Sequence, residues 1–355
     1  MAKTFLATRP DGGAPGASWP RRLRWPACLA VLVALALAPV LSGGGYTIEL
    51  LSKVMIVAIF ALSLQLLVGC TGMVSLGHAA FFGAGAYTTA LLAPESGAAN
   101  LLAMLAVSAV VALLLALIIG ALVLRTRGIY FIMVTLAFAQ MLYYLVHDGK
   151  GFGGSDGSYI YFKPVLGAFG WKWLDTARAG HFYWCVLAVL VATVAVLQLT
   201  MRSRFGHALT GIKHNEQRMT ASGYPVFFYK LASFAIGGSL AGIAGSLYAF
   251  QYGYVNPELF SWRQSGDVLL MVILGGSGFG GAITGALAFV LLSDWLAELT
   301  KHWQLLFGVL IIVAVAVMPH GISGFAATLC ARFERGRGAR GGSNDGVASD
   351  EESAA

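Results

Sequence analysis

Long stretches without a charged residue constrain this chain more than any other feature. Asp, Glu, Lys and Arg are absent from eight runs: 25–48, 54–94, 96–124, 128–147, 179–201, 231–257, 268–293 and 302–331. A helix that spans a bilayer needs about 20 mostly apolar residues. Only 11% of the residues are charged, whereas soluble domains carry about 25%. The runs therefore predict an all-α, polytopic transmembrane protein.

Two of these runs do not fit a single membrane crossing. As one helix, residues 54–94 would measure about 60 Å at 1.5 Å per residue, so we expect two segments with a break near Gly69–Gly72. Residues 268–293 contain seven residues rich in glycine, Gly275–Gly281. Two segments there would keep the arginine-rich C-terminal region in the cytoplasm. The prediction is about ten membrane segments, some interrupted by glycine or re-entrant, with both termini cytoplasmic.

The hydrophilic stretches divide the chain into one membrane domain and two tails. We expect disordered cytoplasmic tails at 1–20 and at 329–355, the second one basic and then acidic. The transmembrane domain is predicted at 21–328. Within it, 148–179 forms an outer loop and 202–230 an inner loop. The net charge of +7 is explained by basic residues at the cytoplasmic ends of the helices, which leaves no reason to expect a nucleic-acid partner.

The first apolar run has two interpretations. Arg21, Arg22 and Arg24 precede it and small residues follow near Ala36–Ala38, an arrangement found in cleaved signal peptides. A first transmembrane helix is the simpler interpretation, because the chain continues as a membrane protein. The N-terminus starts inside in both cases.

The stretch "GMVSLGHAAFFGAGAYTTALL" (residues 72–92) combines small residues with one histidine. Placed on a helix, its small residues recur at spacings of three and four on one face: Gly72, Ser75, Ala79, Gly83, Ala86 and Ala90. Small residues allow close helix contacts in a membrane, so we predict a packing face here. His78 is either a hydrogen-bonding anchor between helices or a functional site of a pathway.

A second glycine-rich stretch, Leu274–Leu292, has the same order of glycines, small residues and leucines. Glycine-interrupted segments in two related halves are typical of a central pathway in transporters with internal repeats. We therefore predict two pseudo-repeated halves. The candidate residues for the translocation pathway and for helix packing are Ser75, His78, Gly83, Gly85, Gly275, Gly276 and Gly278.

The inner loop is long, basic and amphipathic. Its centre, Phe205–Ser222, predicts one or two short helices that end at Gly223 and Pro225. Such a segment either lies on the lipid surface or docks a cytoplasmic partner, because a loop of this size is rarely a mere connection. His207 and His214 have no third ligand nearby, so no metal site is expected.

The outer loop contains "HDGKGFGGSDGSYIY" (residues 147–161), with Gly154, Asp156 and Gly157 at its centre. Asp148 and Asp156 are candidates to contact a partner or a passing amino group; the alternative is a solvated loop without a specific role.

Missing motifs exclude several activities. The chain has no P-loop, no HExxH and no GxSxG motif, so we expect neither ATP binding of that kind nor an enzyme. The four cysteines are far apart without CxxC spacing, which predicts buried thiols and no disulfide, metal or cofactor: Cys28, Cys70, Cys185 and Cys330.

Several segments together resemble the inner-membrane permeases of branched-chain amino acid ABC transporters. The similarity covers most of 48–320 in the family's order. It is carried by the SLGH-x-x-F-x-G-x-GAY pattern of residues 72–92, "RTRGIYFIMVTLAFAQ" (Arg125–Gln140), "GGSDG" (Gly153–Gly157) and the inner loop with the helix after it. The RG-x-Y and GG[ST]DG segments are typical of one of the two paired permease types.

This resemblance implies an inner-membrane transport subunit with several partners: a second homologous permease, cytoplasmic ATPase subunits and a periplasmic substrate-binding protein. The family's degenerate E-x-x-x-x-A-x-G pattern falls on the inner loop, which would couple to the ATPase. The candidate coupling residues are Gly206, Ala208, Glu216, Ala221 and Gly223.

Two departures leave the substrate open. Gly275–Ala286 is about one residue shorter than the family's segment and lacks its proline, and Ser158 replaces the usual leucine after the DG pair. Branched-chain or related hydrophobic amino acids are the first expectation, with urea, short amides or small organic acids as alternatives. An ion- or proton-coupled secondary transporter is the alternative from another class, although the spans offer no mid-membrane carboxylate.

Overall fold

The computed structural model describes residues 45–94, 97–168, 171–175, 179–276, 278–318, 321, 322 and 324. The tails predicted at 1–20 and 329–355 lie outside these residues. The same holds for the predicted first membrane segment and for Cys28 and Cys330.

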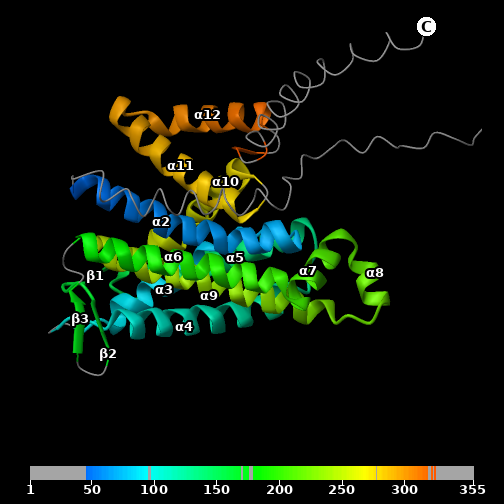
Figure 1. Ribbon diagram of the computed structural model, residues 1–355, viewed down its shortest axis with the longest axis horizontal. Coiled ribbons are helices and arrows are strands. Elements are labelled where there is room, and N and C mark those ends of the chain that lie inside the picture. Colours follow the sequence, from blue (N-terminus) through cyan, green and yellow to red (C-terminus); the bar gives the residue numbers. More distant parts are fainter. Residues whose placement is uncertain are drawn as a thin grey trace, which may run out of the picture.

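The described chain is mainly helical, as the uncharged runs predict (Figure 1). Its α-helices are α2 (Gly45–Gln65), α3 (Ala79–Leu92), α4 (Leu101–Val123), α5 (Ile129–Asp148), α6 (Ala179–Arg202), α7 (Arg204–His214), α8 (Glu216–Ala221), α9 (Val226–Tyr252), α10 (Trp262–Gly275), α11 (Phe279–Leu299) and α12 (Trp303–Val317). A π-helix, η1 (Leu66–Thr71), extends α2. The 3-10 helices are η2 (Lys150–Phe152), η3 (Gly154–Asp156) and η4 (Pro257–Phe260).

Six stretches in the described part are long and apolar enough to cross a membrane: Gly45–Thr71, Leu101–Val123, Ile129–Asp148, Gly180–Arg202, Val226–Tyr252 and Phe279–Leu299. Shorter apolar helices lie at Ala79–Leu92 and Trp303–Ala314. The chain is therefore a multi-pass membrane protein. The count of about ten segments and the two repeated halves stay predictions.

The long helices run side by side and define two ends of the bundle (Figure 1). Helices α7 and α8 lie at one end and the strands at the other. Strand β1 (Ser158–Tyr159) pairs antiparallel with β4 (Tyr254–Val255), and β2 (Val165–Ala168) pairs antiparallel with β3 (Trp171–Asp175). The β1–β4 pair connects the outer loop to the segment that follows α9, so the two parts of the chain meet at this end.

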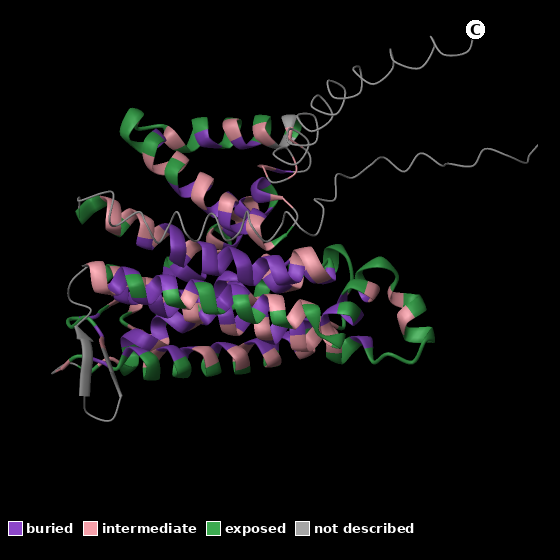
Figure 2. Cartoon of the chain, viewed as in Figure 1, coloured by how far each residue is buried: buried purple, intermediate pink, exposed green. Residues whose placement is uncertain are grey.

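Helix α9 occupies the centre of the bundle and packs against α2, α3 and α4 (Figure 2). Its backbone approaches α3 closely. A Cβ on Gly85 would meet the carbonyl of Gly242, and one on Gly245 would meet the carbonyl of Phe82. Beside these contacts, Thr89 donates a hydrogen bond of 2.7 Å to the hydroxyl of Ser246. The close contact with α9 is therefore made through Gly85, which is not one of the six small residues of the predicted packing face.

Burial separates central helices from peripheral ones. In the most apolar window of each span, 78% of the residues of Gly45–Thr71 are buried, against 28% for α4 and 22% for α5. The outward faces of α4 and α5 carry exposed leucine, valine, isoleucine and methionine side chains. These faces suit contact with lipid, because apolar side chains need no hydrogen-bond partners in the hydrocarbon region.

Both predicted breaks are present. Helix α2 and η1 end at Gly72, which adopts a left-handed conformation with φ of +75°. Helices α10 and α11 are separated at Gly276 and Gly278, with φ values of +85° and +108°. These backbone conformations strain any residue with a side chain, so glycine explains where both runs break.

One sequence prediction about the first break was wrong. Residues 72–92 were expected to be one helix, but α3 begins only at Ala79. Gly72 and Ser75 therefore do not share a helical face with Gly83. The reason lies in tertiary contacts, because the backbone at Gly77 lies directly against the Thr135 carbonyl of α5. The extended chain fills a space that a helix could not enter.

The close contact of α3 with α9 makes a direct prediction. Gly85→Ala should destabilise the protein by about 1–3 kcal/mol, because the new Cβ overlaps the Gly242 backbone. Gly308→Ala on α12 is the matched control, since nothing lies within 4 Å of a Cβ there. Thermal unfolding in detergent measures both. Equal midpoints for the two variants would contradict the close packing.

Candidate functional site

An unwound stretch follows the first break and lies inside the bundle. Between Gly72 and α3 the chain makes no helical turn, so its N–H groups need other partners. Leu76 donates to the Thr135 hydroxyl of α5 at 3.3 Å, and Ala79 donates to the Ser265 hydroxyl of α10 at 2.9 Å. Gly77 donates to the fully buried Ser75 at 3.2 Å. Irregular backbone at membrane depth is tolerated only when protein or a cavity surrounds it.

His78 lies at the end of this stretch and is completely buried. Its ring lies between those of Phe60 and Phe81, with both centroid distances at 5.7 Å. The Nε2 atom is 2.8 Å from the Ser63 hydroxyl of α2. That hydroxyl donates its single hydrogen to the Phe60 carbonyl at 2.6 Å, so Nε2–H of His78 must be the donor. The ring thus joins α3 to α2 as a neutral imidazole.

The other ring nitrogen of His78 explains what this residue can do chemically. Its Nδ1 atom has no hydrogen-bond partner among the described residues, and no carboxylate of the described chain bonds to the ring. A proton relay needs a donor and an acceptor in a continuous chain, whereas His78 has a partner on one side only. The geometry favours the interpretation as an anchor between helices.

The predicted glycines form close contacts within α3 and at the second break. Gly83 lies under the ring of Phe260 in η4, with its Cβ position 2.8 Å from the ring. At the second break, Gly275 of α10 lies against the carbonyl of Gly281 in α11. Helix α10 connects the two places. Its Ser265 binds the first stretch, and Gly275 lies ten residues, about 15 Å, farther along the helix.

The inner loop folds into two helices, as predicted. Ser203 and Asn215 start them, since their side-chain oxygens accept hydrogen bonds from Gly206 and Arg218 at 3.5 and 2.9 Å. Helix α7 buries one face against the bundle, including the candidates Gly206 and Ala208. Helix α8 has no buried residue and projects from the end of the bundle (Figure 1).

The remaining coupling candidates differ in their surroundings. Glu216 forms an ion pair with Lys230 at 2.8 Å and approaches Arg127 at 3.6 Å, so it fixes α8 to α9 and to the α4–α5 connection. Ala221 and Gly223 are exposed at the end of α8, and Gly223 has a φ of +83°. The loop thus presents an exposed tip on a fixed base.

A lysine of α7 contacts the first break directly. Lys213 donates a hydrogen bond of 2.7 Å to the carbonyl of Gly69 in η1. Carbonyl groups at the end of a helix lack intrahelical partners, and a cation there is favourable. Sequence reasoning missed this residue, because its partner lies 144 positions away.

The outer candidates are held together by β1 and β4. The Tyr254 hydroxyl donates to the Asp156 carbonyl at 3.0 Å, and Gly157 lies against the Val255 carbonyl. The carboxylate of Asp156 is exposed and accepts a hydrogen bond of 3.1 Å from the Ser155 hydroxyl. Gly154 has a φ of +59°. This loop is a shaped surface at the end opposite α7 and α8.

Four charged residues near this end form a cluster that the sequence analysis did not single out. Lys53 of α2 and Asp294 of α11 form an ion pair of 2.9 Å. Glu49 and Glu298 lie one turn away on the same two helices. All four line a cleft of 470 Å³. Glu49, Lys53 and Asp294 served only to mark the ends of uncharged runs, but the spacings 49/53 and 294/298 would have placed each pair on one helix face.

The described residues contain no group of three or more His, Cys, Asp or Glu side chains that could hold a metal ion. Cys70 is partly buried and Cys185 buried, and both are free.

Comparisons of the sequence with a family model and with known proteins agree with one another. The family model described as "Branched-chain amino acid transport system / permease component" matches residues 46–315. The high-affinity branched-chain amino acid transport system permease protein LivM of Escherichia coli is 30% identical over 317 residues, covering 83% of this chain and 74% of that protein. LivM of Salmonella typhimurium is 28% identical over 314 residues, with 83% and 73% covered. The probable branched-chain amino acid transport permease protein LivH of Methanocaldococcus jannaschii is 24% identical over 187 residues, with 48% and 55% covered. No solved structure matches the chain.

Two substitutions of His78 separate the anchor from a proton relay. Gln keeps an N–H donor for the Ser63 hydroxyl, whereas Phe keeps neither ring nitrogen. We expect His78→Gln to transport with the wild-type pH profile, and His78→Phe to lose about 1–2 kcal/mol of stability. Transport across the neutral pH range and thermal unfolding are the measurements. A changed pH profile in His78→Gln would instead identify a proton pathway.

Proposed function

Because this chain belongs to the family of branched-chain amino acid transport permeases, we propose that it is the permease subunit of an ATP-driven ABC importer for branched-chain or related hydrophobic amino acids. The family match over residues 46–315 carries this proposal. The chain supplies the membrane part, and ATP hydrolysis belongs to separate subunits, since the sequence has no P-loop.

The inner loop is the proposed docking site for the ATPase. The exposed tip at Ala221 and Gly223 contacts the partner, while Glu216 and the buried face of α7 hold the loop in place. A force on a loop with a fixed base reaches the bundle rather than bending the loop. This supports docking over a loose position on the lipid surface.

Two further partners complete the proposed importer. Relatives include proteins named LivM and LivH, which supports pairing with a second, homologous permease. The loop with Gly154, Asp156 and Gly157 lies at the end opposite α7 and α8, where a periplasmic binding protein would deliver substrate. We propose that the chain lies in the bacterial inner membrane, with the α7–α8 end and both termini in the cytoplasm.

Reconstitution tests the proposed function. The chain is assembled in liposomes with a second permease, ATPases and a binding protein of the same transport family from the same organism. We expect uptake of leucine that requires ATP and the binding protein. Uptake that persists without the ATPases and follows an ion gradient would overturn the proposal in favour of a secondary transporter.

Lys213 should transmit motion of the loop to η1, because its side chain connects α7 to the Gly69 carbonyl. We expect Lys213→Met to lower uptake about tenfold while the complex still hydrolyses ATP. Loss of one charge-assisted hydrogen bond costs about 1.5 kcal/mol, which corresponds to about a tenfold change. Lys213→Arg keeps a donor and is the control that should retain uptake. If Lys213→Met takes up as much substrate per ATP hydrolysed as the wild type, Lys213 does not transmit the motion.

A further inference from the structure

A cleft opens at the end of the bundle opposite α7 and α8. It has a volume of 470 Å³ and lies between the first turns of α2, the last turn of α9 and the last turns of α11. This volume lies within the range of about 300–1,000 Å³ that is typical of small-molecule sites. Four ionisable side chains near the ends of two candidate membrane spans line this cleft.

The charges in the cleft are arranged in two layers. Glu49 and Lys53 are four residues apart on α2, and Asp294 and Glu298 are four residues apart on α11, so each pair lies on one helix face. In the deeper layer, the Lys53 ammonium lies 2.9 and 3.3 Å from the two carboxylate oxygens of Asp294. The outer layer, about 6 Å away along each helix, contains two carboxylates.

Among the residues that line the cleft, the outer layer contains no positive charge. Within the described part of the chain, neither Glu49 nor Glu298 forms an ion pair, and the four side chains together carry a net charge of −2. Two carboxylates on facing helices repel each other unless a cation lies between them. The cleft is therefore complementary to a ligand that brings one positive charge.

We propose that this cleft binds a free amino acid in its zwitterionic form. The ammonium group of the ligand lies between Glu49 and Glu298, and its carboxylate faces the remaining N–H donors of Lys53. Leu50 and Ala297, which also line the cleft, provide an apolar wall for the side chain of the ligand. This inference rests on the proposed function and adds the location of a binding site for the substrate class proposed there.

The chemistry of the cleft separates the possible ligands. Urea and short amides carry no charge and would supply no counter-charge to either glutamate. Organic acids carry only the negative charge that the cleft already has in excess. A metal ion is disfavoured, because no group of three suitable side chains gathers in the described residues. An amino acid supplies the missing positive charge through its ammonium group, and its carboxylate can face the Lys53 ammonium.

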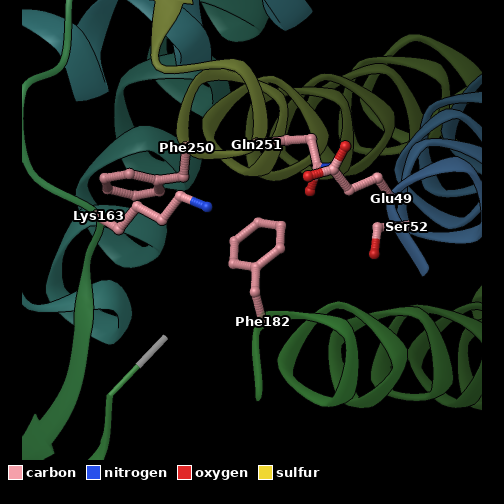
Figure 3. Close-up of a pocket in the computed structure, with 6 residues that line it drawn as sticks. All are labelled: Glu49, Ser52, Lys163, Phe182, Phe250 and Gln251. Carbon is pink, nitrogen blue, oxygen red and sulfur yellow. The ribbon is translucent and has the colours of Figure 1, made fainter. Parts of the chain in front are cut away.

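A smaller hollow of 20 Å³ adjoins the cleft and shares Glu49 and Gln251 with it. In Figure 3 the Lys163 ammonium points into this hollow from the outer loop, while Glu49 and Gln251 reach it from α2 and α9. Glu49 thus lies between the cleft and a hollow that Lys163 also lines. This places the proposed ammonium site at the junction between the outer loop and the bundle.

Binding to the purified full chain in nanodiscs tests the proposal by calorimetry. The probes are L-leucine, leucinol without the carboxylate, 4-methylpentanoate without the ammonium, and uncharged isobutyramide. We expect leucine to bind most tightly, leucinol more weakly, and the other two at least about tenfold more weakly than leucine. The combined variant Glu49→Gln/Glu298→Gln should lose at least tenfold in affinity for leucine and leucinol.

The variant is chosen to leave the fold intact, because it spares the Lys53–Asp294 ion pair. Glu258→Gln in η4 is the matched control, since this exposed glutamate does not line the cleft. No saturable leucine binding to the wild type, equal affinity in the double variant, isobutyramide binding as tight as leucine, or binding of calcium chloride alone would each overturn the proposal.

Uptake by the reconstituted importer distinguishes this failure from failure of the proposed function. ATP-driven leucine uptake with an unchanged KM in the double variant would reject the proposed binding site in the cleft and support the proposed importer. A raised KM in the double variant, with Glu258→Gln at the wild-type value, supports both. Leucine binding that depends on the two glutamates, without any ATP-driven uptake by the wild type, would keep the cleft and reject the importer.

Discussion

An unwound backbone inside a helical membrane bundle must satisfy its hydrogen bonds without water, and much of this structure depends on that requirement. Between Gly72 and Ala79 the chain has no helical ladder, so hydroxyl groups of Thr135 and Ser265 accept its N–H groups. Each unsatisfied group there would cost several kcal/mol. The hydrogen bonds that avoid this cost also join α5 and α10 to the unwound stretch. Three parts of the chain far apart in sequence are thereby fixed around one break.

Close backbone contacts supply the second condition for this arrangement. Hydrophobic burial does not hold helices together in lipid, so packing must come from shape and from polar contacts. Gly85 and Gly242 let α3 and α9 touch, and Gly275 and Gly281 do the same for α10 and α11. The first of these contacts lies in the middle of α3 and α9, and the second lies at the break between α10 and α11. Glycine therefore serves two roles here: it permits the breaks, and it lets helices pack closely.

The sequence predicted the breaks and the inner helices because local chemistry decides them. Run length, glycine and proline marked Gly72, Gly276 and the end of α8, and the family resemblance was confirmed by the matches over residues 46–315. The unwound path to Ala79 was not predictable, because it depends on hydroxyl groups 59 and 186 residues away.

The charged cleft was not predicted from the sequence, for a different reason. Glu49 and Asp294 were used to mark where apolar runs stop, although in the structure they lie within helices that are candidate membrane spans. A charge at the edge of a run does not say whether the helix ends there. Only the long-range pairing of α2 with α11 shows that both helices continue and that their charged turns face one cleft.

Helix α2 with η1 connects the two ends of the molecule. Lys53 ties one end of it to Asp294 of α11, and Gly69 at the other end accepts a hydrogen bond from Lys213 of α7. These points are 16 residues, about 24 Å, apart on one buried helix. Ser63 between them holds His78. A displacement of α7 must therefore either break its bond to Gly69 or move η1, and a movement of η1 along the helix axis acts on His78 and on the charged turn at Lys53. The two lysines make α2 a single physical link between the inner loop and the opposite cleft.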